Sequence, residues 1–379
     1  MNSKTVTLLL ALIFPCATAF AESLPIPAPP TFDASSYVLL DYGSGAVLAE
    51  HNSRERLDPA SITKIMTAYV LYKALAANDV HLEDQVLISE KAWRSIGSRM
   101  FVEVGDKIFL EDLLLGLVIQ SGNDASVALA EHVGGTEEAF ADIMNAQALR
   151  LGLKDSHFVN ATGLPDPDHY TTAYDIALLS HALIKDFPEE YKRYAQKEFT
   201  FNGIKQYNRN RLLWRDSAVD GLKTGYTEAA GYCLAASAMR NGMRLISAVM
   251  GADSDKTRTV NSQALLNYGF RYYESHKLFK AGETLAEQRM WKGQSKSIQL
   301  GLEKDLYVAI PRGQYDLLIA NMDVDTDIVA PIDQGQQVGA VKITLKGEAY
   351  LDKPLVALQA NPKGGLWRRI VDFFLRLFS

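Results

Sequence analysis

The chain has 379 residues, of which 47% are hydrophobic and 22% are charged, and its formal net charge at pH 7 is −6. A chain of this length and apolar content can bury a large core, and its length favours two domains over one. Charged residues of both signs are spread along the chain, so there is no broad basic surface, and we exclude nucleic acid as a partner.

The first 21 residues have the features of a secretory signal peptide. Lys4 precedes an apolar run from Val6 to Ile13, and Ala19-Phe20-Ala21 forms a small-residue cleavage site. A transmembrane helix is not favoured, because the run falls short of the roughly 20 apolar residues needed to span a bilayer. We therefore predict export, with residues 1–21 removed and the mature chain starting near Glu22.

The cysteines predict an exported protein without a disulfide. Cys16 follows Pro15 at a position where lipid-attachment signals carry a small residue, so we do not expect lipidation. After cleavage only Cys233 remains, and no intramolecular disulfide can form. Cys233 lies in a stretch typical of a buried strand, and we interpret it as a small core residue and not as a nucleophile.

A proline-rich linker is predicted at residues 22–31, followed by a folded α+β domain at 32–276. In chain order, we expect a β-hairpin at 37–41 and 46–50, a largely buried helix at 61–77, and further helices at 110–119, 125–132, 136–151 and 174–184. Thr172 and Asp175 have the capping-box spacing for the last of these. Strands at 199–201, 232–239 and 244–250 and a helical stretch near 258–272 complete the domain, so one sheet would collect both ends of its chain.

The pattern changes in residues 277–360 to short alternating segments separated by Gly and Pro, such as 297–302, 305–310 and 338–346. This pattern is typical of a small all-β domain, either a sandwich or a barrel. The remaining residues, 361–379, form a terminal tail.

Three short motifs occur in the order Ser61-Ile62-Thr63-Lys64, Ser121-Gly122-Asn123 and Lys223-Thr224-Gly225. Ser-x-x-Lys alone is a weak signal, because about one chance match is expected in a chain of this length, but the joint occurrence is specific. Residues three apart are neighbours on a helix, so Ser61 Oγ and Lys64 Nζ are expected on one face. The start of the helix also offers N–H groups to a developing oxyanion.

Serine needs a base to become a nucleophile, and no motif places a histidine for this task. A lysine packed among apolar groups and beside another cation can lose its charge, which makes Lys64 the candidate base and Lys223 the second cation. Ser121 and Asn123 fall between two predicted helices, where a plain turn is the alternative explanation. In the functional interpretation, Ser121 relays a proton to the leaving group, and Asn123 binds a substrate amide and helps to hold Lys64.

The third motif precedes a strand-rich segment. Lys223 and Thr224 would meet a substrate carboxylate, and Gly225 would let the substrate run alongside a strand edge.

Together the motifs resemble those of the penicillin-interacting serine transferases. With the surroundings at 59–67, 120–125, 160–163, 171–175 and 220–225, the chain is similar over about residues 30–275 to the D-alanyl-D-alanine carboxypeptidases of the penicillin-binding protein five/six group. The resemblance implies a β-lactamase/transpeptidase-like domain and removal of the terminal D-alanine from peptidoglycan stem peptides through an acyl-serine intermediate. It implies no metal and no organic cofactor.

The resemblance also implies an oxyanion hole formed by the backbone N–H groups of Ser61 and Tyr226, and relatives often carry His at the position of Tyr226. Because the contact is made by the backbone, this change affects substrate preference more than the reaction. Arg258 matches an arginine that relatives use near the terminal carboxylate, and the alternative is a solvated helix charge.

Class A β-lactamases share the three motifs but need a glutamate base for deacylation between the second and the third. Residues 139–188 contain no glutamate, so we expect slow deacylation and covalent inhibition by β-lactams. Two alternatives to a carboxypeptidase stay open: a DD-endopeptidase that acts on cross-links, and a non-catalytic peptidoglycan-binding scaffold.

The terminal tail has helical amphipathic spacing. Apolar residues at 367, 370, 371, 374 and 378 share one face, and Arg368, Asp372 and Arg376 fall opposite. The segment is too short and too charged to span a bilayer, so we predict a helix that lies on an anionic membrane, attracted by the basic residues Lys363, Arg368, Arg369 and Arg376. The alternative is a helix docked on the protein's own core. The expected location is the periplasmic face of the cytoplasmic membrane.

Overall fold

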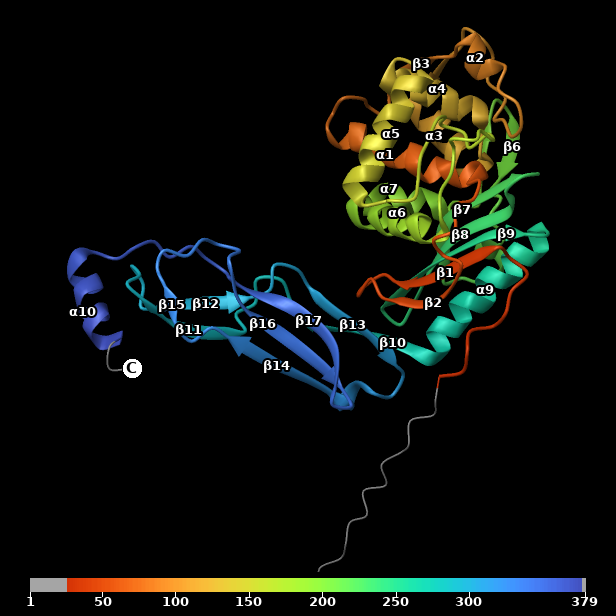
Figure 1. Ribbon diagram of the computed structural model, residues 1–379. Coiled ribbons are helices and arrows are strands. Elements are labelled where there is room, and N and C mark those ends of the chain that lie inside the picture. The colour runs from red at the N-terminus through yellow and green to blue at the C-terminus, as the bar shows by residue number, and fades with distance from the viewer. Residues whose placement is uncertain (1–25, 377–379) are drawn as a thin grey trace, which may run out of the picture.

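A computed structural model describes residues 26–376 and divides them into two domains (Figure 1). The N-terminal domain ends with the long helix α9 (Asp255–Tyr272), and an all-β domain begins with strand β10 (Tyr273–Phe279). The predicted signal peptide at 1–21 and the apolar residue Phe378 lie outside the described residues. Between residues 26 and 376, no helix combines the length and the apolar character needed to cross a bilayer.

An antiparallel sheet forms the base of the N-terminal domain, in the order β2 (Val47–His51), β1 (Ser36–Asp41), β9 (Met243–Ala252), β8 (Gly231–Arg240) and β7 (Val219–Thr227). Strand β1 pairs with β9, which confirms that one sheet collects both ends of the domain. Because side chains alternate along a strand, Val38 and Leu40 face the helical layer, whereas Leu39 packs on the side of α9. The sheet is covered on both faces, and β7 is one of its two edges.

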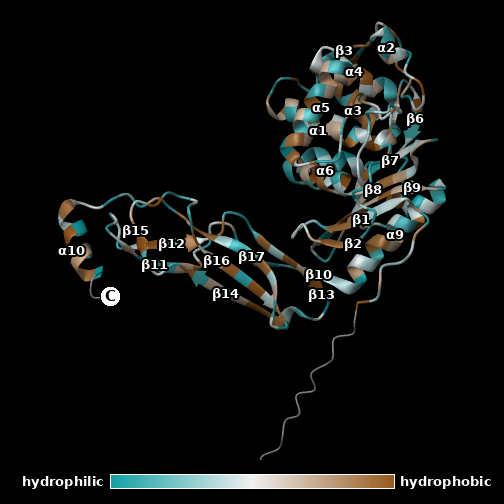
Figure 2. Ribbon diagram, viewed as in Figure 1, coloured by the Kyte–Doolittle hydropathy of each residue, from teal (hydrophilic) through white to brown (hydrophobic). Residues whose placement is uncertain are grey.

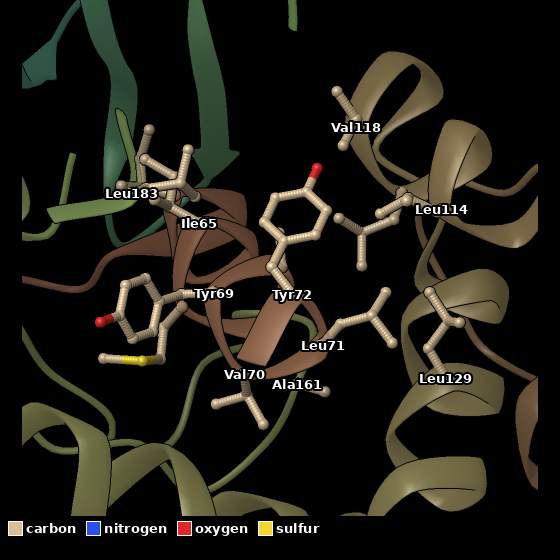
Figure 3. Close-up of a cluster of buried hydrophobic side chains, with 14 of the residues drawn as sticks. Ile65, Tyr69, Val70, Leu71, Tyr72, Leu114, Val118, Leu129, Ala161 and Leu183 are labelled. Carbon is tan, nitrogen blue, oxygen red and sulfur yellow. The ribbon is translucent and has the colours of Figure 1, made fainter. Parts of the chain in front are cut away.

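The helical layer contains α1 (Lys64–Ala76), α3 (Leu110–Leu115), α4 (Asn123–Gly134), α5 (Glu137–Leu151) and α6 (Ala173–Asp186). The prediction of a buried helix is confirmed, because every residue of α1 from 64 to 72 is buried. Figure 3 shows Leu71 and Tyr72 of α1 directed toward Leu114 and Leu129, with Leu183 near Ile65 on another side. This packing holds α1 rigidly, and the residues at its start are held with it.

Three local features differ from, or refine, the sequence-based expectations. The predicted helix at 110–119 changes after Leu115 into a wider π-type turn, η2 (Gly116–Gln120), which ends at Ser121 in a left-handed conformation. The Thr172 hydroxyl accepts a hydrogen bond from Asp175 N at 3.0 Å, so Thr172 caps α6 as predicted. The reciprocal half of the capping box does not form, because the Asp175 carboxylate instead accepts from Asp155 N and Ser156 Oγ. The Lys-Thr-Gly motif lies inside edge strand β7 and does not merely precede a strand.

Short elements complete the N-terminal domain: η1 (Ala60–Thr63), β3 (Gln85–Leu87), α2 (Glu90–Trp93), β4 (Lys107–Phe109), α7 (Pro188–Tyr191), η3 (Lys192–Ala195), β5 (Glu198–Phe201), β6 (Ile204–Tyr207) and α8 (Leu212–Arg215). Of these, η1 leads into α1 and packs against β7, β3 pairs with β4, and β5 pairs with β6.

The C-terminal domain contains a six-stranded sheet in the order β14 (Leu318–Val324), β16 (Gln337–Leu345), β17 (Glu348–Ala357), β12 (Ser297–Gly301), β11 (Ala286–Trp291) and β15 (Ile328–Val329). Strand β10 pairs with β13 (Leu306–Pro311) in a separate two-stranded sheet. The domain has its own core, which includes Met290, Leu300, Val341 and Leu355, and the prediction of a small all-β domain is confirmed. The chain then continues into helix α10 (Leu366–Arg376), which lies at the end of the β domain far from α9 (Figure 1).

Candidate active site

The first motif lies at the junction between η1 and α1. Ser61 belongs to η1 and Lys64 is the first residue of α1, and this spacing places Lys64 Nζ 2.9 Å from Ser61 Oγ. The Lys64 side chain is completely buried (0% exposed). Burial lowers the pKa of Lys64 to about 7; the nearby Asp124 carboxylate opposes this effect and the Arg209 cation adds to it.

The surroundings of Lys64 suit a neutral amine. Its Nζ also lies 2.6 Å from Asn123 Oδ1 and 2.7 Å from the Thr162 carbonyl oxygen, and both of these atoms can only accept hydrogen bonds. A neutral amine has two N–H groups and one lone pair. The two acceptors use both N–H groups, so the lone pair remains for the third neighbour, the Ser61 hydroxyl. The geometry therefore allows Lys64 to take the proton of Ser61.

A tight loop delivers the Thr162 carbonyl to Lys64. The Asn160 side chain accepts hydrogen bonds from the backbone N–H groups of Thr162 and Gly163 at 3.1 and 2.7 Å. Gly163 has a φ of +84°, and a Cβ atom at this position would lie 1.8 Å from the Ala60 carbonyl oxygen. Only glycine lets this loop approach η1 so closely, so Gly163 keeps Thr162 in contact with Lys64.

The second motif forms the turn between η2 and α4. Ser121 adopts a left-handed conformation with φ +66°, and Asn123 is the first residue of α4. The Asn123 side chain is oriented from both ends, because its Nδ2 donates to the Ile96 carbonyl at 2.6 Å while its Oδ1 accepts from Lys64. The buried Asp124 carboxylate accepts from the backbone N–H groups of Met100 and Phe101. These hydrogen bonds hold the loop at residues 96–101 against the second motif.

The third motif joins the other two from edge strand β7. Lys223 Nζ donates to Ser121 Oγ at 2.8 Å, and the Lys223 side chain is only 2% exposed. Burial lowers the pKa of Lys223 well below its usual value, and the charge of Lys64 acts in the same direction. Thr224 is also buried, and a Cβ added to Gly225 would lie 3.0 Å from the Pro59 carbonyl oxygen. Strand β7 therefore packs directly against the segment that carries Ser61.

The two remaining predicted residues, Tyr226 and Arg258, lie at the end of the motif. The Tyr226 side chain is 51% exposed and packs against the ring of Tyr232, with 4.3 Å between the ring centroids. Arg258 is only 7% exposed, so the alternative of a solvated helix charge is wrong. Its Nη1 donates to the Gly225 carbonyl at 2.7 Å and its Nε donates to Asp255 at 3.1 Å. The guanidinium is thus engaged with the main chain of β7.

An open pocket of about 760 Å³ adjoins Tyr226 and Arg258, and its lining is rich in arginine and aromatic residues: Tyr207, Asn208, Arg209, Arg211, Trp214, Arg215, Tyr226, Tyr232, Asp255 and Arg258. Sequence reasoning missed Arg209, although three arginines between residues 209 and 215 are a visible basic cluster. Arg209 Nε donates to the Gln120 carbonyl at 2.9 Å, directly beside the second motif. Between residues 26 and 376, no acceptor binds its two terminal nitrogens, so these can face a ligand.

Two other reactive residue types near the cleft have structural roles. His169 Nε2 lies 2.8 Å from Thr63 Oγ1, and its Nδ1 accepts from Val159 N at 3.2 Å. Burial lowers the pKa of His169 to about 4, so the ring is neutral and contacts Thr63, not Ser61. Cys233 is buried, and burial raises the pKa of its thiol to about 11, which confirms it as a core residue. Across the described part of the chain, no three His, Cys, Asp or Glu side chains are grouped so that they could hold a metal ion.

Comparisons with known proteins identify the family of this chain. Residues 24–254 match the peptidase S11 family, described as D-alanyl-D-alanine carboxypeptidase, and residues 273–363 match the penicillin-binding protein 5 C-terminal domain. The D-alanyl-D-alanine carboxypeptidase DacC of Escherichia coli is 44% identical over 369 residues, which cover 95% of this chain and 92% of that protein.

Solved structures give the same result. Penicillin-binding protein 5 from Haemophilus influenzae has a TM-score of 0.86 at 42% identity, covering 89% of this chain and 100% of that one. Penicillin-binding protein D2 from Listeria monocytogenes, solved in an ampicillin-bound form, has a TM-score of 0.59 at 29% identity and covers 64% of this chain and 100% of its own. The chain belongs to the peptidase S11 family of D-alanyl-D-alanine carboxypeptidases and carries the penicillin-binding protein 5 C-terminal domain.

Proposed function

We propose that this D-alanyl-D-alanine carboxypeptidase is a serine-type enzyme in which Ser61 is acylated by the peptidoglycan stem peptide. The observation that carries the proposal is the contact of 2.9 Å between Ser61 Oγ and Lys64 Nζ, in a site where Lys64 is fully buried. A buried lysine with a pKa of about 7 is partly neutral at physiological pH, so it can act as a general base.

The reaction proceeds in two halves. Ser61 Oγ attacks the carbonyl carbon between the two D-alanines, and its proton passes to Lys64 Nζ. The backbone N–H groups of Ser61 and Tyr226 stabilise the oxyanion. Ser121 then relays to the departing D-alanine nitrogen the proton that Lys64 took from Ser61, so that Lys64 and Ser121 both regain their starting states as the C–N bond breaks; Lys223, 2.8 Å from Ser121 Oγ, supports this transfer. In the second half Lys64 takes a proton from the water that attacks the acyl-serine ester, and this proton passes to Ser61 Oγ as the ester bond breaks, which regenerates Ser61.

The terminal carboxylate of the substrate would be recognised where basic groups converge. Lys223 and Thr224 lie on edge strand β7, where Lys223 contacts Ser121, and Asn123 can offer a second Nδ2 hydrogen to a substrate amide. Arg209 supports this role best among the arginines, because its terminal nitrogens have no acceptor within residues 26–376. Arg258, in contrast, already uses Nη1 and Nε on Gly225 and Asp255. We therefore assign carboxylate recognition to Arg209 together with Lys223 and Thr224.

β-Lactams would acylate Ser61 and leave slowly. Residues 139–188 contain no glutamate that could serve as a deacylating base. The ampicillin-bound form of the Listeria relative supports the same binding in this chain. The protein would therefore be inhibited covalently by penicillins.

The enzyme would be exported and held at the membrane surface. The proposal of export is based on the signal-peptide features of residues 1–21, which precede the linker at 22–31 and the folded chain. Attachment rests on α10, whose apolar residues Trp367 and Phe374 are 81% and 57% exposed. In Figure 2 the ribbon of α10 alternates between brown hydrophobic and teal hydrophilic segments, as expected of an amphipathic helix. Anionic lipid at the periplasmic face of the cytoplasmic membrane is the partner that such a helix fits.

The contacts of α10 support an assignment of its apolar face to lipid. The Asp372 carboxylate is 3% exposed and accepts from Lys292 N at 2.6 Å, so the polar face of α10 contacts the β domain. Arg368 and Arg376 form ion pairs with Asp372 and Asp327. The apolar face points away from this contact, which argues against α10 being buried in the protein's own core. Lys363 and Arg369 supply basic charge at the start of the helix.

The experiment that tests the enzymatic proposal compares the mature chain with a Ser61→Ala variant. Both are incubated with a diacyl-L-Lys-D-Ala-D-Ala tripeptide and with a fluorescent penicillin, and free D-alanine and covalent label are measured. Release of D-alanine together with labelling, both lost in Ser61→Ala, is the expected result. Labelling without D-alanine release would indicate an endopeptidase, and the absence of both signals would indicate a non-catalytic scaffold.

A further inference from the structure

Arg258 lies at the edge of the pocket beside Tyr226, but its guanidinium is buried and directed at strands β7 and β8. It belongs to the first turn of α9 and is 7% exposed. Its Nη1 reaches two carbonyl oxygens, that of Gly225 at 2.7 Å and that of Cys233 at 3.3 Å. Gly225 and Cys233 are direct partners across β7 and β8, so the guanidinium bridges the two strands at the end of the Lys-Thr-Gly motif.

The orientation of this guanidinium is fixed. Asp255 Oδ1 accepts hydrogen bonds from both Nε and Nη2 of Arg258, which leaves Nη1 directed at the strands. Asp255 also pairs with Arg211 at 2.8 Å, so its carboxylate is itself held in place. Because Asp255 holds the guanidinium in one orientation, Nη1 stays within hydrogen-bond distance of the Gly225 carbonyl oxygen and makes a charge-assisted hydrogen bond to it.

The carbonyl that Arg258 contacts belongs to a peptide group with a proposed catalytic role. The Gly225 C=O and the Tyr226 N–H are two ends of one planar amide, and in a trans peptide they point in opposite directions. A cation that donates a hydrogen bond to the carbonyl oxygen draws electron density of the amide toward that oxygen. The N–H of the same amide then becomes a stronger hydrogen-bond donor. The Tyr226 N–H is one of the two groups assigned above to the oxyanion hole.

The same peptide group cannot shift away from this contact. On the side of the nucleophile, a Cβ on Gly225 would lie 3.0 Å from Pro59 O and 3.1 Å from atoms of Ala60 and Ile62. The Gly225–Tyr226 amide is thus held between the segment that carries Ser61 and the Arg258 guanidinium.

We propose that Arg258 is a positioning residue that strengthens the oxyanion hole through the Gly225–Tyr226 peptide group, and that it does not bind the substrate carboxylate. This inference rests on the proposed acyl-serine mechanism. It assigns different tasks to two neighbouring arginines: Arg209 recognises the leaving-group carboxylate, and Arg258 acts on the tetrahedral intermediate.

The test uses two probes that separate these tasks. One is the diacyl-L-Lys-D-Ala-D-Ala tripeptide, which has a leaving-group carboxylate. The other is a peptide boronic acid that ends at the scissile position, so that it forms a tetrahedral adduct with Ser61 but has no such carboxylate. Arg258→Gln is expected to weaken boronate binding and to lower kcat for the tripeptide by a similar factor of about ten, since losing an entire oxyanion-hole donor costs about 10²–10³.

Arg209→Gln is the matched control. It is expected to raise KM or lower kcat/KM for the tripeptide while leaving boronate affinity within about twofold, because the boronate has no carboxylate to lose. If Arg258→Gln gave this second pattern, Arg258 would be a carboxylate ligand and the inference would be overturned. If the boronate failed to bind even the wild-type protein, the acyl-serine mechanism itself would be contradicted.

An infrared measurement guards against a loss of folding. The carbonyl stretch of the ¹³C-labelled acyl-enzyme reports the strength of the hydrogen bonds in the oxyanion hole. The red shift is expected to be largest in the wild type, smaller in Arg258→Lys and smallest in Arg258→Gln, because lysine keeps a positive charge near the Gly225 carbonyl and glutamine does not. Equal shifts in folded wild type and Arg258→Gln, with unchanged boronate affinity, would overturn the inference. Thermal unfolding of each variant identifies any that do not fold.

Discussion

The catalytic cleft and helix α10 both depart from the usual distribution of residues, but in opposite directions. In the cleft, Lys64 and Lys223 are buried at 0% and 2% exposure. On α10, large apolar side chains are exposed, and Trp367 is 81% exposed. Charged groups usually remain in water and large apolar groups usually leave it, so each departure costs stability.

The difference shows how each region offsets that cost. The cleft compensates internally, because carbonyl and amide oxygens fixed by the fold surround Lys64. Helix α10 compensates only on its polar face, where Asp372 and Arg368 contact the β domain and each other. Its apolar face has no such partner in the described chain, so it needs an external one. The catalytic site thus finds all the partners of its buried charges within the fold, whereas the apolar face of α10 needs a partner outside the described chain.

The largest effect should follow from removing the ability of Lys64 to be neutral. Lys64→Arg keeps the charge but cannot lose its proton at physiological pH, so penicillin acylation is expected to fall by about 10³-fold. Stopped-flow measurement of label formation gives the rate, and thermal unfolding checks the fold. Near wild-type acylation in a folded Lys64→Arg protein would show that Ser61 does not depend on this base.

A smaller loss is expected from Gly163→Ala, which leaves every catalytic side chain in place. The new Cβ would lie 1.8 Å from the Ala60 carbonyl oxygen and would displace Thr162 from Lys64. We expect a loss of about 2–4 kcal/mol in the free energy of unfolding and at least about tenfold slower acylation. Chemical denaturation and penicillin labelling provide the two measurements.

Gly152→Ala is the control for the backbone effect alone. Gly152 has a similar φ of +74°, but a Cβ there would meet nothing within 4 Å. It is expected to lose about 1–2 kcal/mol and no acylation rate. Equal effects of the two substitutions on acylation would contradict the role given to the loop at 160–163.

The smallest effect on catalysis is expected from substitutions in α10, which should change binding to membranes and not the reaction. Trp367→Glu combined with Phe374→Glu is expected to reduce binding to anionic vesicles by about 100-fold, because burying each aromatic side chain contributes about 1.5–3 kcal/mol. D-Alanine release from the soluble tripeptide should stay unchanged. Leu149→Glu, at an apolar residue that is 83% exposed on α5, is the control and should retain vesicle binding. Equal vesicle binding by all three proteins would refute the anchor.

The sequence was sufficient where chemistry depends on local spacing. Ser61 and Lys64 are one helical turn apart, and Thr172 caps α6 as its spacing predicts. The alternation of apolar residues was enough to predict the hairpin of β1 and β2 and the all-β character of the C-terminal domain.

The rest of the site depends on tertiary contacts that no local pattern encodes. The Thr162 acceptor is a main-chain atom, so its residue type gives no signal beyond the Asn160 and Gly163 that shape its loop. Arg258 was predicted from resemblance, but its orientation toward the Gly225 carbonyl depends on how α9 packs against β7 and β8. Arg209 reaches the second motif from a loop 89 residues away in sequence.

The central claim is that burial makes Lys64 a neutral base for Ser61, and the pH dependence of penicillin acylation tests it most directly. Because the pKa of Lys64 is lowered to about 7, the base is protonated and inactive below that pH and neutral above it. The acylation rate constant of the wild-type protein should therefore rise with pH through a midpoint near 7 and reach a plateau. A rate that does not change between about pH 5 and 9, or that rises only near the ordinary lysine pKa of about 10.4, would contradict the account.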